Sequence, residues 1–327
     1  MKKTISHNCS VCKSNNFIKL FSVGDFDNIG LDFDLLKCKI CGMVQIYPLP
    51  DKKLLNTYYQ QTYYGAGRLK FISAVEKAVV LANKYRANKI VKYITKVPSH
   101  KKTISKILDI GCGRGLLLNA FKKKGFDCFG VEREEFTSTH EDKLTIFKKD
   151  LKDIGFKTVS MDVIVLWHVF EHLIDPTKTL EELTRILKPG GLLVLSVPNF
   201  NSFQSFYFKN HWFHLDLPRH HYHFSLKNLN MLLNKNNYTI IYKSTYSVEQ
   251  NIFGFIQSFF NKFIFFLPNN SFYFLLKQDK KKLSCYIKLC LWILLSLLII
   301  PLAVTEFFAS GILNRGAVLT IIAKKYI

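Results

Sequence analysis

Four cysteines near the start of the chain stand in two pairs with the spacing of metal ligands. Cys9 and Cys12 form the first C-x-x-C pair, and Cys38 and Cys41 form the second. Four thiolates suit the tetrahedral coordination of zinc, and closed sites of this kind are structural rather than catalytic. The pattern therefore predicts a structural zinc ion held by these four side chains. The alternative is a set of four free cytosolic thiols.

A glycine-rich turn lies one third of the way along the chain. Gly111, Gly113 and Gly115 belong to the segment LDIGCGRG, which leads into a helix-like stretch. Glycine allows the backbone to approach a ligand closely, because no Cβ intrudes. The P-loop pattern is absent, and the dinucleotide-binding pattern fails because Leu116 stands where its third glycine would be.

The glycine turn and the segments after it resemble the class I methyltransferases, which use S-adenosylmethionine. Glu132 ends the next apolar run, where that family places the acid that binds the ribose hydroxyls. Asp150 matches the acid that faces the adenine amino group. DVIVLWHVFEHLIDP (162–176) and LKPGGLLVLSVPN (187–199) resemble the family's fourth and fifth strand motifs. The resemblance implies a cofactor site made by Asp109, Gly111, Cys112, Gly113, Gly115, Glu132, Asp150, Leu151 and Trp167.

Histidines gather after the fourth and fifth predicted strands, at the edge of a parallel sheet where ligands bind. Methyl transfer to oxygen usually needs a base with a pKa near the working pH, and imidazole suits that task. We therefore predict the catalytic base among His168, His172, His214 and His220. The segment WFHLDLPRHHYHF (212–224) is expected to form a lid over the acceptor. The alternative is a structural cover whose polar groups satisfy one another.

The same region could hold a metal ion. Ubiquinone-biosynthesis O-methyltransferases, which this core resembles, can carry E-x-x-E-H after the fourth strand, whereas this chain has H-x-x-E-H from His168 to His172. Because the first ligand differs, a catalytic metal at His168, Glu171 and His172 is the less favoured reading. The structural alternative for His172 is a hydrogen bond to the backbone at a helix start.

The segments that must position these residues alternate short apolar runs with amphipathic stretches, which is typical of a parallel sheet covered by helices. Asp175 and Pro176 predict a helix start, with Asp as N-cap and Pro at the first position. The resemblance implies a Rossmann-like α/β fold with a seven-stranded, mostly parallel sheet and helices on both faces. Strands are expected at 106–110, 126–132, 145–151, 161–166, 192–197, 238–247 and 317–325.

Composition divides the chain into a zinc-ribbon-like module (1–50), a methyltransferase domain (51–248 and 314–327) and a hydrophobic insertion (249–313). The run LCLWILLSLLIIPLAVT is uncharged, and Pro301 is expected to interrupt it. The strands flanking the insertion should pair antiparallel, so both of its ends lie on one side of a membrane. A re-entrant hairpin or an in-plane helix remains, with KQDKKK (277–282) at anionic headgroups. The alternatives are a buried helical subdomain and a dimer interface.

The net charge of +22 favours anionic partners such as an acidic membrane surface. The segment MKKTISHNCS lacks the apolar region of a secretory signal, which predicts a position in the cytoplasm, peripheral or monotopic at the inner face of the cell membrane. We expect a methyltransferase acting at oxygen on a lipid-linked, glycan-type or other small-molecule acceptor, because zinc ribbons precede such cores in some sugar-modifying relatives.

Two other functions stay open. A nucleic-acid methyltransferase is less favoured, because LWHVFEH stands where adenine-modifying enzymes carry [DNS]-P-P-[YF]. The other is a non-catalytic scaffold that uses the cofactor fold only for assembly, and the intact glycine turn and both acids argue against it.

Overall fold

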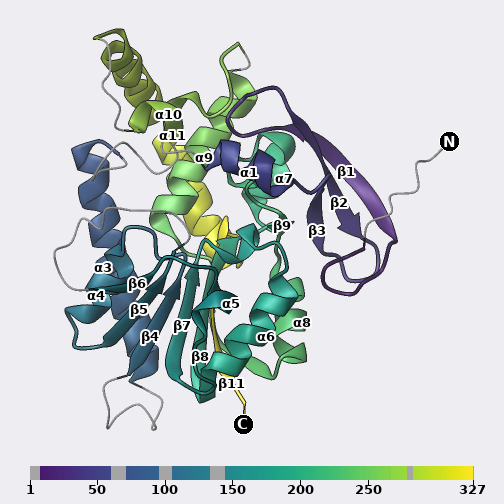
Figure 1. The fold of residues 1–327 in the computed structure, drawn as a ribbon. Coiled ribbons are helices and arrows are strands. Elements are labelled where there is room, and N and C mark those ends of the chain that lie inside the picture. Colours follow the sequence, from purple (N-terminus) through teal and green to yellow (C-terminus); the bar gives the residue numbers. More distant parts are fainter. Residues whose placement is uncertain are drawn as a thin grey trace.

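The computed structural model describes residues 8–59, 71–95, 105–132, 144–264, 266–277 and 283–326. The described strands form a four-stranded sheet of order β1-β2-β3-β9 and a seven-stranded sheet of order β10-β11-β8-β7-β4-β5-β6 (Figure 1). The expected seven-stranded sheet is therefore confirmed.

The large sheet is parallel except at β11, which runs antiparallel to both of its neighbours. Its strands are β4 (Lys106–Ile110), β5 (Asp127–Val131), β6 (Thr145–Phe147), β7 (Met161–Trp167), β8 (Leu187–Pro198), β10 (Tyr238–Ser244) and β11 (Val318–Lys325). The third strand is shorter than the predicted 145–151, because Asp150 already caps the short helix α5 (Leu151–Ile154).

Helices cover the two faces of this sheet, which accounts for the nearly continuous apolar sequence of its central strands. Consecutive strand residues, which point to opposite faces, are both buried: Val163 and Ile164 are fully buried and belong to different core clusters. One cluster includes side chains of α3 and α4, and the other includes side chains of α6 and α8. These helices are α3 (Ser73–Ile94), α4 (Leu116–Lys122), α6 (Pro176–Ile186) and α8 (Leu226–Lys235).

The predicted start of α6 is confirmed, since the Asp175 side chain accepts a hydrogen bond from the Lys178 amide and Pro176 follows it. The helix ends at Ile186, and the chain enters β8 at once. The segment Pro189-Gly190-Gly191 therefore belongs to the strand rather than to a separate turn.

The N-terminal sheet extends beyond the first fifty residues. Its strands are β1 (Phe17–Gly24), β2 (Asp32–Cys38), β3 (Val44–Tyr47) and β9 (Tyr222–His223), and helix α1 (Lys52–Tyr58) follows β3. β3 pairs antiparallel with β9, which comes from the predicted lid segment. The cysteine module and the lid thus share one sheet.

The insertion between β10 and β11 is helical. It contains α9 (Val248–Phe263), α10 (Ser271–Leu276) and α11 (Leu283–Ile312). Since β10 and β11 pair antiparallel with Ser244 opposite Thr320, both ends of the insertion leave from the same edge of the sheet.

The predicted interruption at Pro301 is wrong, because α11 continues through this residue. The proline ring lies on the exposed side of the helix, where it removes one backbone donor without meeting packed neighbours. Of the basic run expected at a membrane surface, only Lys277 is described, and its side chain is buried against Tyr273 and Phe274. Residues 278–282 lie outside the described part of the chain.

Candidate functional site

The glycine turn begins directly after β4 and has a backbone that favours glycine. Gly111, Gly113 and Gly115 have φ of +66°, +52° and +72°, in the left-handed region. A Cβ on Gly111 would lie 2.4 Å from Val169 Cγ2, so this position also lacks space for a side chain. Gly115 is the N-cap of α4, which places the turn at the start of a helix, where anionic groups bind.

Two acids, Asp109 and Glu132, lie at this turn. The amide of Gly113 donates a hydrogen bond of 2.9 Å to Oε2 of Glu132, at the end of β5. Asp109 is buried at the end of β4, and burial, followed by the charge of Glu132, raises the pKa of Asp109 to about 8. Asp109 is therefore largely protonated at pH 7 and can donate a hydrogen bond, whereas Glu132 offers an acceptor to hydroxyl groups.

A cavity of about 150 Å³ lies beside the turn. Its lining includes Asn83, Arg86, Asp109, Gly111, Cys112, Arg114, Leu116, Leu117 and Trp167. The Arg86 guanidinium stacks 4.7 Å from the centre of the Trp167 ring and pairs with Glu249, and Arg114 pairs with Glu76 at 3.0 Å. Cofactor pockets usually measure roughly 300–1,000 Å³. These arginine side chains must therefore shift to admit a ligand of that size.

Asp150 and Leu151 follow β6, the strand beside Glu132. The Glu132 amide donates to the Phe147 carbonyl at 3.0 Å, which joins the ends of β5 and β6. Asp150 is the N-cap residue of α5, and its side chain makes no capping hydrogen bond there. The glycine cradle, which a Cβ would fill, and the acids at adjacent strand ends fit an adenosine-type cofactor.

His168 lies one residue beyond the end of β7 and next to Trp167, which lines the cavity beside the glycine turn. Its backbone has φ of +54°, an unusual value for a residue with a side chain and one that occurs often at active sites. Its Nδ1 lies 3.2 Å from Oε1 of the fully buried Glu171. Its Nε2 is buried and has no hydrogen-bond partner among the described residues.

Two further imidazoles face Glu171 with a defined tautomer. Nδ1 of His172 lies 3.0 Å from both the Arg219 carbonyl, which can only accept, and the Tyr59 hydroxyl, so it carries the proton. Nδ1 of His220 donates to the His214 carbonyl at 2.9 Å. Their Nε2 atoms therefore carry lone pairs. Burial lowers the pKa of His172, and burial together with the neighbouring imidazoles lowers the pKa of His220, so both are neutral at pH 7.

The donor atoms of Glu171, His172 and His220 lie within 4.8 Å of one another, which is a size that could hold a metal ion. This group differs from the sequence-based set, since His220 takes the place of His168. His214 has another role in the packing, because its Nε2 donates to the Gln250 carbonyl at 3.1 Å and its ring lies against Gly254 of α9. Burial lowers the pKa of His214 to about 4.

The N-terminal module holds the lid through a buried cation. The Arg219 side chain is 1% exposed, and its guanidinium pairs with Asp27 at 2.7 Å and with Asp216 at 2.6 Å. The Ile46 amide of β3 donates to the carbonyl of His221 at 3.1 Å. Side chains and backbone of the module thus fix the segment that carries His220.

The four predicted zinc ligands come together at one end of the module. Cys9 Sγ lies 3.4 Å from Cys41 Sγ, Cys12 Sγ lies 3.5 Å from Cys38 Sγ, and all four sulfurs lie within 4.8 Å of one another. Tetrahedral zinc with Zn–S bonds of about 2.3 Å requires sulfurs roughly 3.8 Å apart. The cluster therefore fits the geometry of a zinc site.

Comparison with known proteins agrees with this geometry. Residues 82–243 match the family model described as a methyltransferase domain. This part of the chain is a class I methyltransferase domain. A probable S-adenosylmethionine-dependent methyltransferase of Mycolicibacterium smegmatis is 30% identical over 97 residues, which cover 28% of this chain and 38% of that protein.

A ubiquinone biosynthesis O-methyltransferase of Coxiella burnetii is 30% identical over 133 residues, which cover 38% of this chain and 54% of that protein. The matches to these two curated relatives thus span between 38% and 54% of their lengths. The crystal structure of a SAM-dependent methyltransferase from Archaeoglobus fulgidus aligns with a TM-score of 0.46 and 18% identity, over 74% of this chain and 92% of that one.

Within the methyltransferase domain, sequence reasoning missed the residues that cover the cofactor cavity from α3. Asn83 and Arg86 line the cavity and lie three residues apart, on one face of that helix. The apolar residues between 69 and 97 have roughly helical spacing, but the position of the helix over the glycine turn depends on tertiary packing that no local pattern encodes.

Proposed function

We propose that this protein is an S-adenosylmethionine-dependent methyltransferase that modifies a hydroxyl oxygen, with His168 as the base. The observation that carries the proposal is the 3.2 Å contact between His168 Nδ1 and Glu171 Oε1, one residue away from Trp167 of the cofactor cavity. When bound, the cofactor supplies an electrophilic methyl group. Gly111, Gly113 and Glu132 would hold it at the end of β4.

His168 and Glu171 divide the proton transfer between them. Glu171 accepts the Nδ1–H of His168 and so directs the lone pair to Nε2, the buried nitrogen that no described residue engages. Nε2 would remove the proton of the acceptor hydroxyl, and the carboxylate would stabilise the resulting imidazolium. A positioned base of this kind contributes roughly 10²- to 10⁴-fold to a rate.

The charge around the base favours a neutral reacting group. Arg219, the guanidinium beside this histidine cluster, is already paired with Asp27 and Asp216. The neighbouring imidazoles of His172 and His220 are neutral, because burial lowers their pKa. A carboxylate or phosphate would find little compensation here, whereas an alcohol or phenol needs only the hydrogen bond to His168.

The acceptor we propose is a lipid-linked, glycan-type or other small molecule presented at the cytoplasmic face of a membrane. Two features support this setting, namely the net charge of +22 and one described helix, Ser284–Ile312, that is long and apolar enough to cross a membrane. We also propose that Cys9, Cys12, Cys38 and Cys41 hold a structural zinc ion, as the spacing of their sulfurs supports.

Calorimetry with S-adenosylmethionine and transfer of a labelled methyl group to membrane lipid extracts test the chemistry. The His168→Gln variant should bind the cofactor as tightly as the wild type and lose at least about a hundredfold in transfer rate. Tyr326→Gln, at an exposed position after β11, is the control and should keep its rate. Wild-type transfer rates in His168→Gln would exclude the base, and a folded wild type without cofactor affinity would exclude the enzyme.

A further inference from the structure

Helix α11 touches the rest of the protein along one narrow stripe. Its buried side chains are Leu289, Trp292, Ser296, Ala303, Phe307 and Ser310, spaced three, four or seven apart. This is the spacing of a single face of a helix. The remaining circumference carries Leu291, Leu294, Leu295, Leu298 and Leu302, all exposed. Between Lys288 and Glu306 the helix has no charged side chain.

The extent of this exposed surface indicates what covers it. Exposed apolar patches beyond a few hundred Å² mark protein or membrane contacts. A second copy of the chain would cover one further stripe of the helix and leave the apolar flanks in water. Leu298, which is 78% exposed, and Leu294, which is 59% exposed, share their side of the helix with one polar residue, Thr305. The Thr305 hydroxyl already donates to the Pro301 carbonyl of the same helix at 2.8 Å, so it does not offer a free donor to set the register of a protein partner. Lipid acyl chains, in contrast, cover the whole remaining circumference.

The topology determines how α11 meets a bilayer. Because β10 and β11 are antiparallel neighbours, the insertion leaves and re-enters the sheet at one edge, and a single crossing is excluded. The buried stripe runs from Leu289 to Ser310, so the body of the protein lies along most of the helix. A helix of 30 residues is about 45 Å long and would therefore rest flat in one leaflet.

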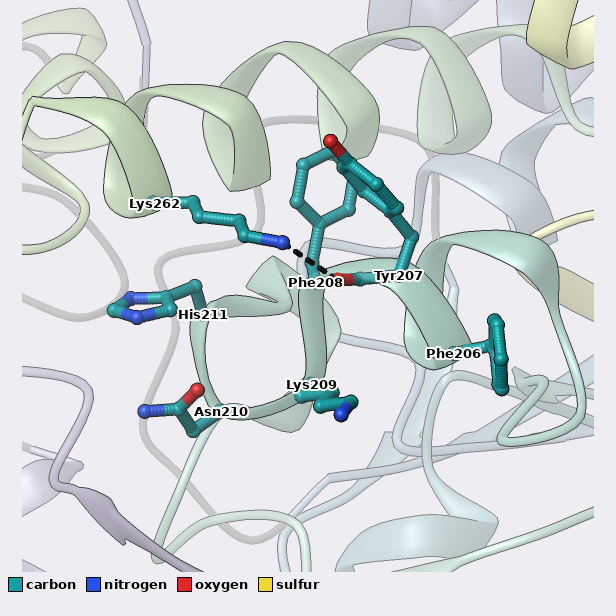
Figure 2. A pocket seen from close by; sticks show the side chains of 7 residues that line it. All are labelled: Phe206, Tyr207, Phe208, Lys209, Asn210, His211 and Lys262. Atoms are coloured by element: carbon teal, nitrogen blue, oxygen red, sulfur yellow. Dashed lines mark hydrogen bonds between the residues drawn. The ribbon is translucent and has the colours of Figure 1, made fainter.

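A cationic and aromatic pocket lies beside this surface, away from the glycine turn. It has a volume of about 390 Å³ and is formed by α9 together with α7 (Phe203–Phe208) and the 3-10 turn that follows it. Figure 2 shows Lys262 of α9 reaching the backbone carbonyl of Tyr207, a hydrogen bond of 2.9 Å. Its lining residues are Phe206, Tyr207, Phe208, Lys209, Asn210, His211 and Lys262, with no acid among them.

The pocket and α11 are joined through the last turns of α9. Lys262 lies 4.0 Å from the centre of the Tyr207 ring and 5.8 Å from that of Phe263. Phe263 is half-exposed, and Phe260, one turn before it, packs 4.4 Å from Trp292 of α11. Exposed aromatic rings and lysines at the border of an apolar surface are typical of the membrane interface.

We propose that α11 lies in one leaflet of a bilayer and that the pocket between α7 and α9 receives the phosphate of an acidic phospholipid. The leucine face enters the acyl region, while Lys262, Lys209 and His211 remain at headgroup depth. Burial and the charge of Lys262 lower the pKa of His211, as expected where a cation lies beside the imidazole. The docking extends the membrane part of the proposed function and does not depend on its chemical part.

Flotation with phosphatidylcholine vesicles, with and without phosphatidylglycerol, tests the surface. The wild type should float with the mixed vesicles, and the double variant Leu294→Glu/Leu298→Glu should lose more than about tenfold in partitioning. Leu81→Glu is the matched control, since Leu81 is 63% exposed on α3, and it should float like the wild type. Circular dichroism and calorimetry with S-adenosylmethionine verify that each variant is folded.

A second pair of variants tests the pocket. Lys262→Ala should weaken binding to the phosphatidylglycerol vesicles about fivefold and leave binding to pure phosphatidylcholine nearly unchanged. Lys84→Ala, an exposed lysine of α3, controls for the loss of one charge. Equal losses in Lys262→Ala and Lys84→Ala would overturn the headgroup pocket. A wild type that ignores vesicles and sediments as a dimer, with Leu294→Glu/Leu298→Glu monomeric, would replace lipid by a second copy and leave the methyl-transfer proposal standing.

Quenching of attached fluorophores by lipids brominated at a known depth reports the orientation of α11 in the bilayer. Labels at Leu291→Cys and Leu302→Cys, in a chain with Cys285→Ser and Cys290→Ser, should be quenched equally by lipids brominated at one depth. A difference between the two positions would show that the helix is inserted steeply and would overturn the flat geometry.

Discussion

Gly111 and Gly113 have similar left-handed backbone conformations but different surroundings. Their alanine variants therefore distinguish the cost of backbone strain from the cost of a steric clash. Gly111→Ala places a Cβ 2.4 Å from Val169, whereas a Cβ at Gly113 meets nothing within 4 Å. Gly113→Ala should therefore cost only the left-handed conformation, about 1–2 kcal/mol. Gly111→Ala should add a clash and abolish measurable cofactor binding. Calorimetry with S-adenosylmethionine checks this, and equal losses in the two variants would contradict it.

Buried neutral histidines make the stability depend on pH. Burial lowers the pKa of His214 to about 4, while an unfolded histidine titrates near 6.5. Below pH 6.5 the unfolded chain therefore binds more protons than the folded one. The stabilisation is complete above pH 6.5 and is lost as the pH falls toward 4, by roughly 3 kcal/mol for this residue.

Urea unfolding of the wild type and of His214→Gln at pH 7 and pH 5 measures this effect. Between pH 7 and pH 5 the unfolding free energy of the variant should fall less steeply than that of the wild type. The difference in slope should correspond to nearly one bound proton. Since both proteins carry the same four cysteines, comparing them also removes any contribution from the titration of that cluster at low pH. Parallel curves for the two proteins would show that His214 already titrates normally in the folded state.

At the scale of elements, the sharing of one sheet by β3 and β9 makes the acceptor side depend on the N-terminal module. Asp27→Ala removes one partner of the buried Arg219 and should cost about 2 kcal/mol, since Asp216 remains. Hydrogen exchange should accelerate around residues 217–223, while β4 stays protected. Asp34→Ala, which breaks the exposed pair with Lys19, should cost less than about 1 kcal/mol. Uniform acceleration over the whole chain would argue against a local hold on the lid.

Elements with strong local signals could be predicted, and long-range partners could not. The strand before Gly111, the N-cap at Asp175 and the cysteine pairs depend on neighbours in the sequence, and the structure confirms the helix start and brings the cysteines together. The pairing of β3 with β9 joins segments far apart in the chain, and β9 has only two residues. The contact of Arg86 with Trp167 likewise depends on how α3 crosses the sheet.

At the scale of the whole molecule, the insertion and the methyltransferase domain form one packed unit. Glu249 of α9 pairs with Arg86 over the cofactor cavity, and Gln204 of α7 donates to Glu306 of α11 at 2.9 Å. Excision of 249–313 would therefore expose buried surface of the methyltransferase domain, because the insertion is not a domain that packs by itself.

Gly254 in α9 tests this packing. A Cβ there would lie 2.3 Å from Nε2 of His214 in the lid, although alanine is the better helix former by about 1 kcal/mol. Gly254→Ala should therefore lower the free energy of unfolding by about 1–3 kcal/mol. In the His214→Ala background the same change should be neutral or stabilising. Thermal unfolding of the four proteins of this cycle measures the coupling, and a stabilising Gly254→Ala in the wild type would refute the contact.

The pairing of β3 with β9 can form only late in the synthesis of the chain. β3 leaves the ribosome long before its partner strand, and at roughly 5–20 residues per second the delay is on the order of ten seconds. During that time Cys9, Cys12, Cys38 and Cys41 are already available to capture a metal ion. Metal capture during synthesis would hold β1, β2 and β3 as a preformed template, onto which the histidine-bearing segment docks when it emerges.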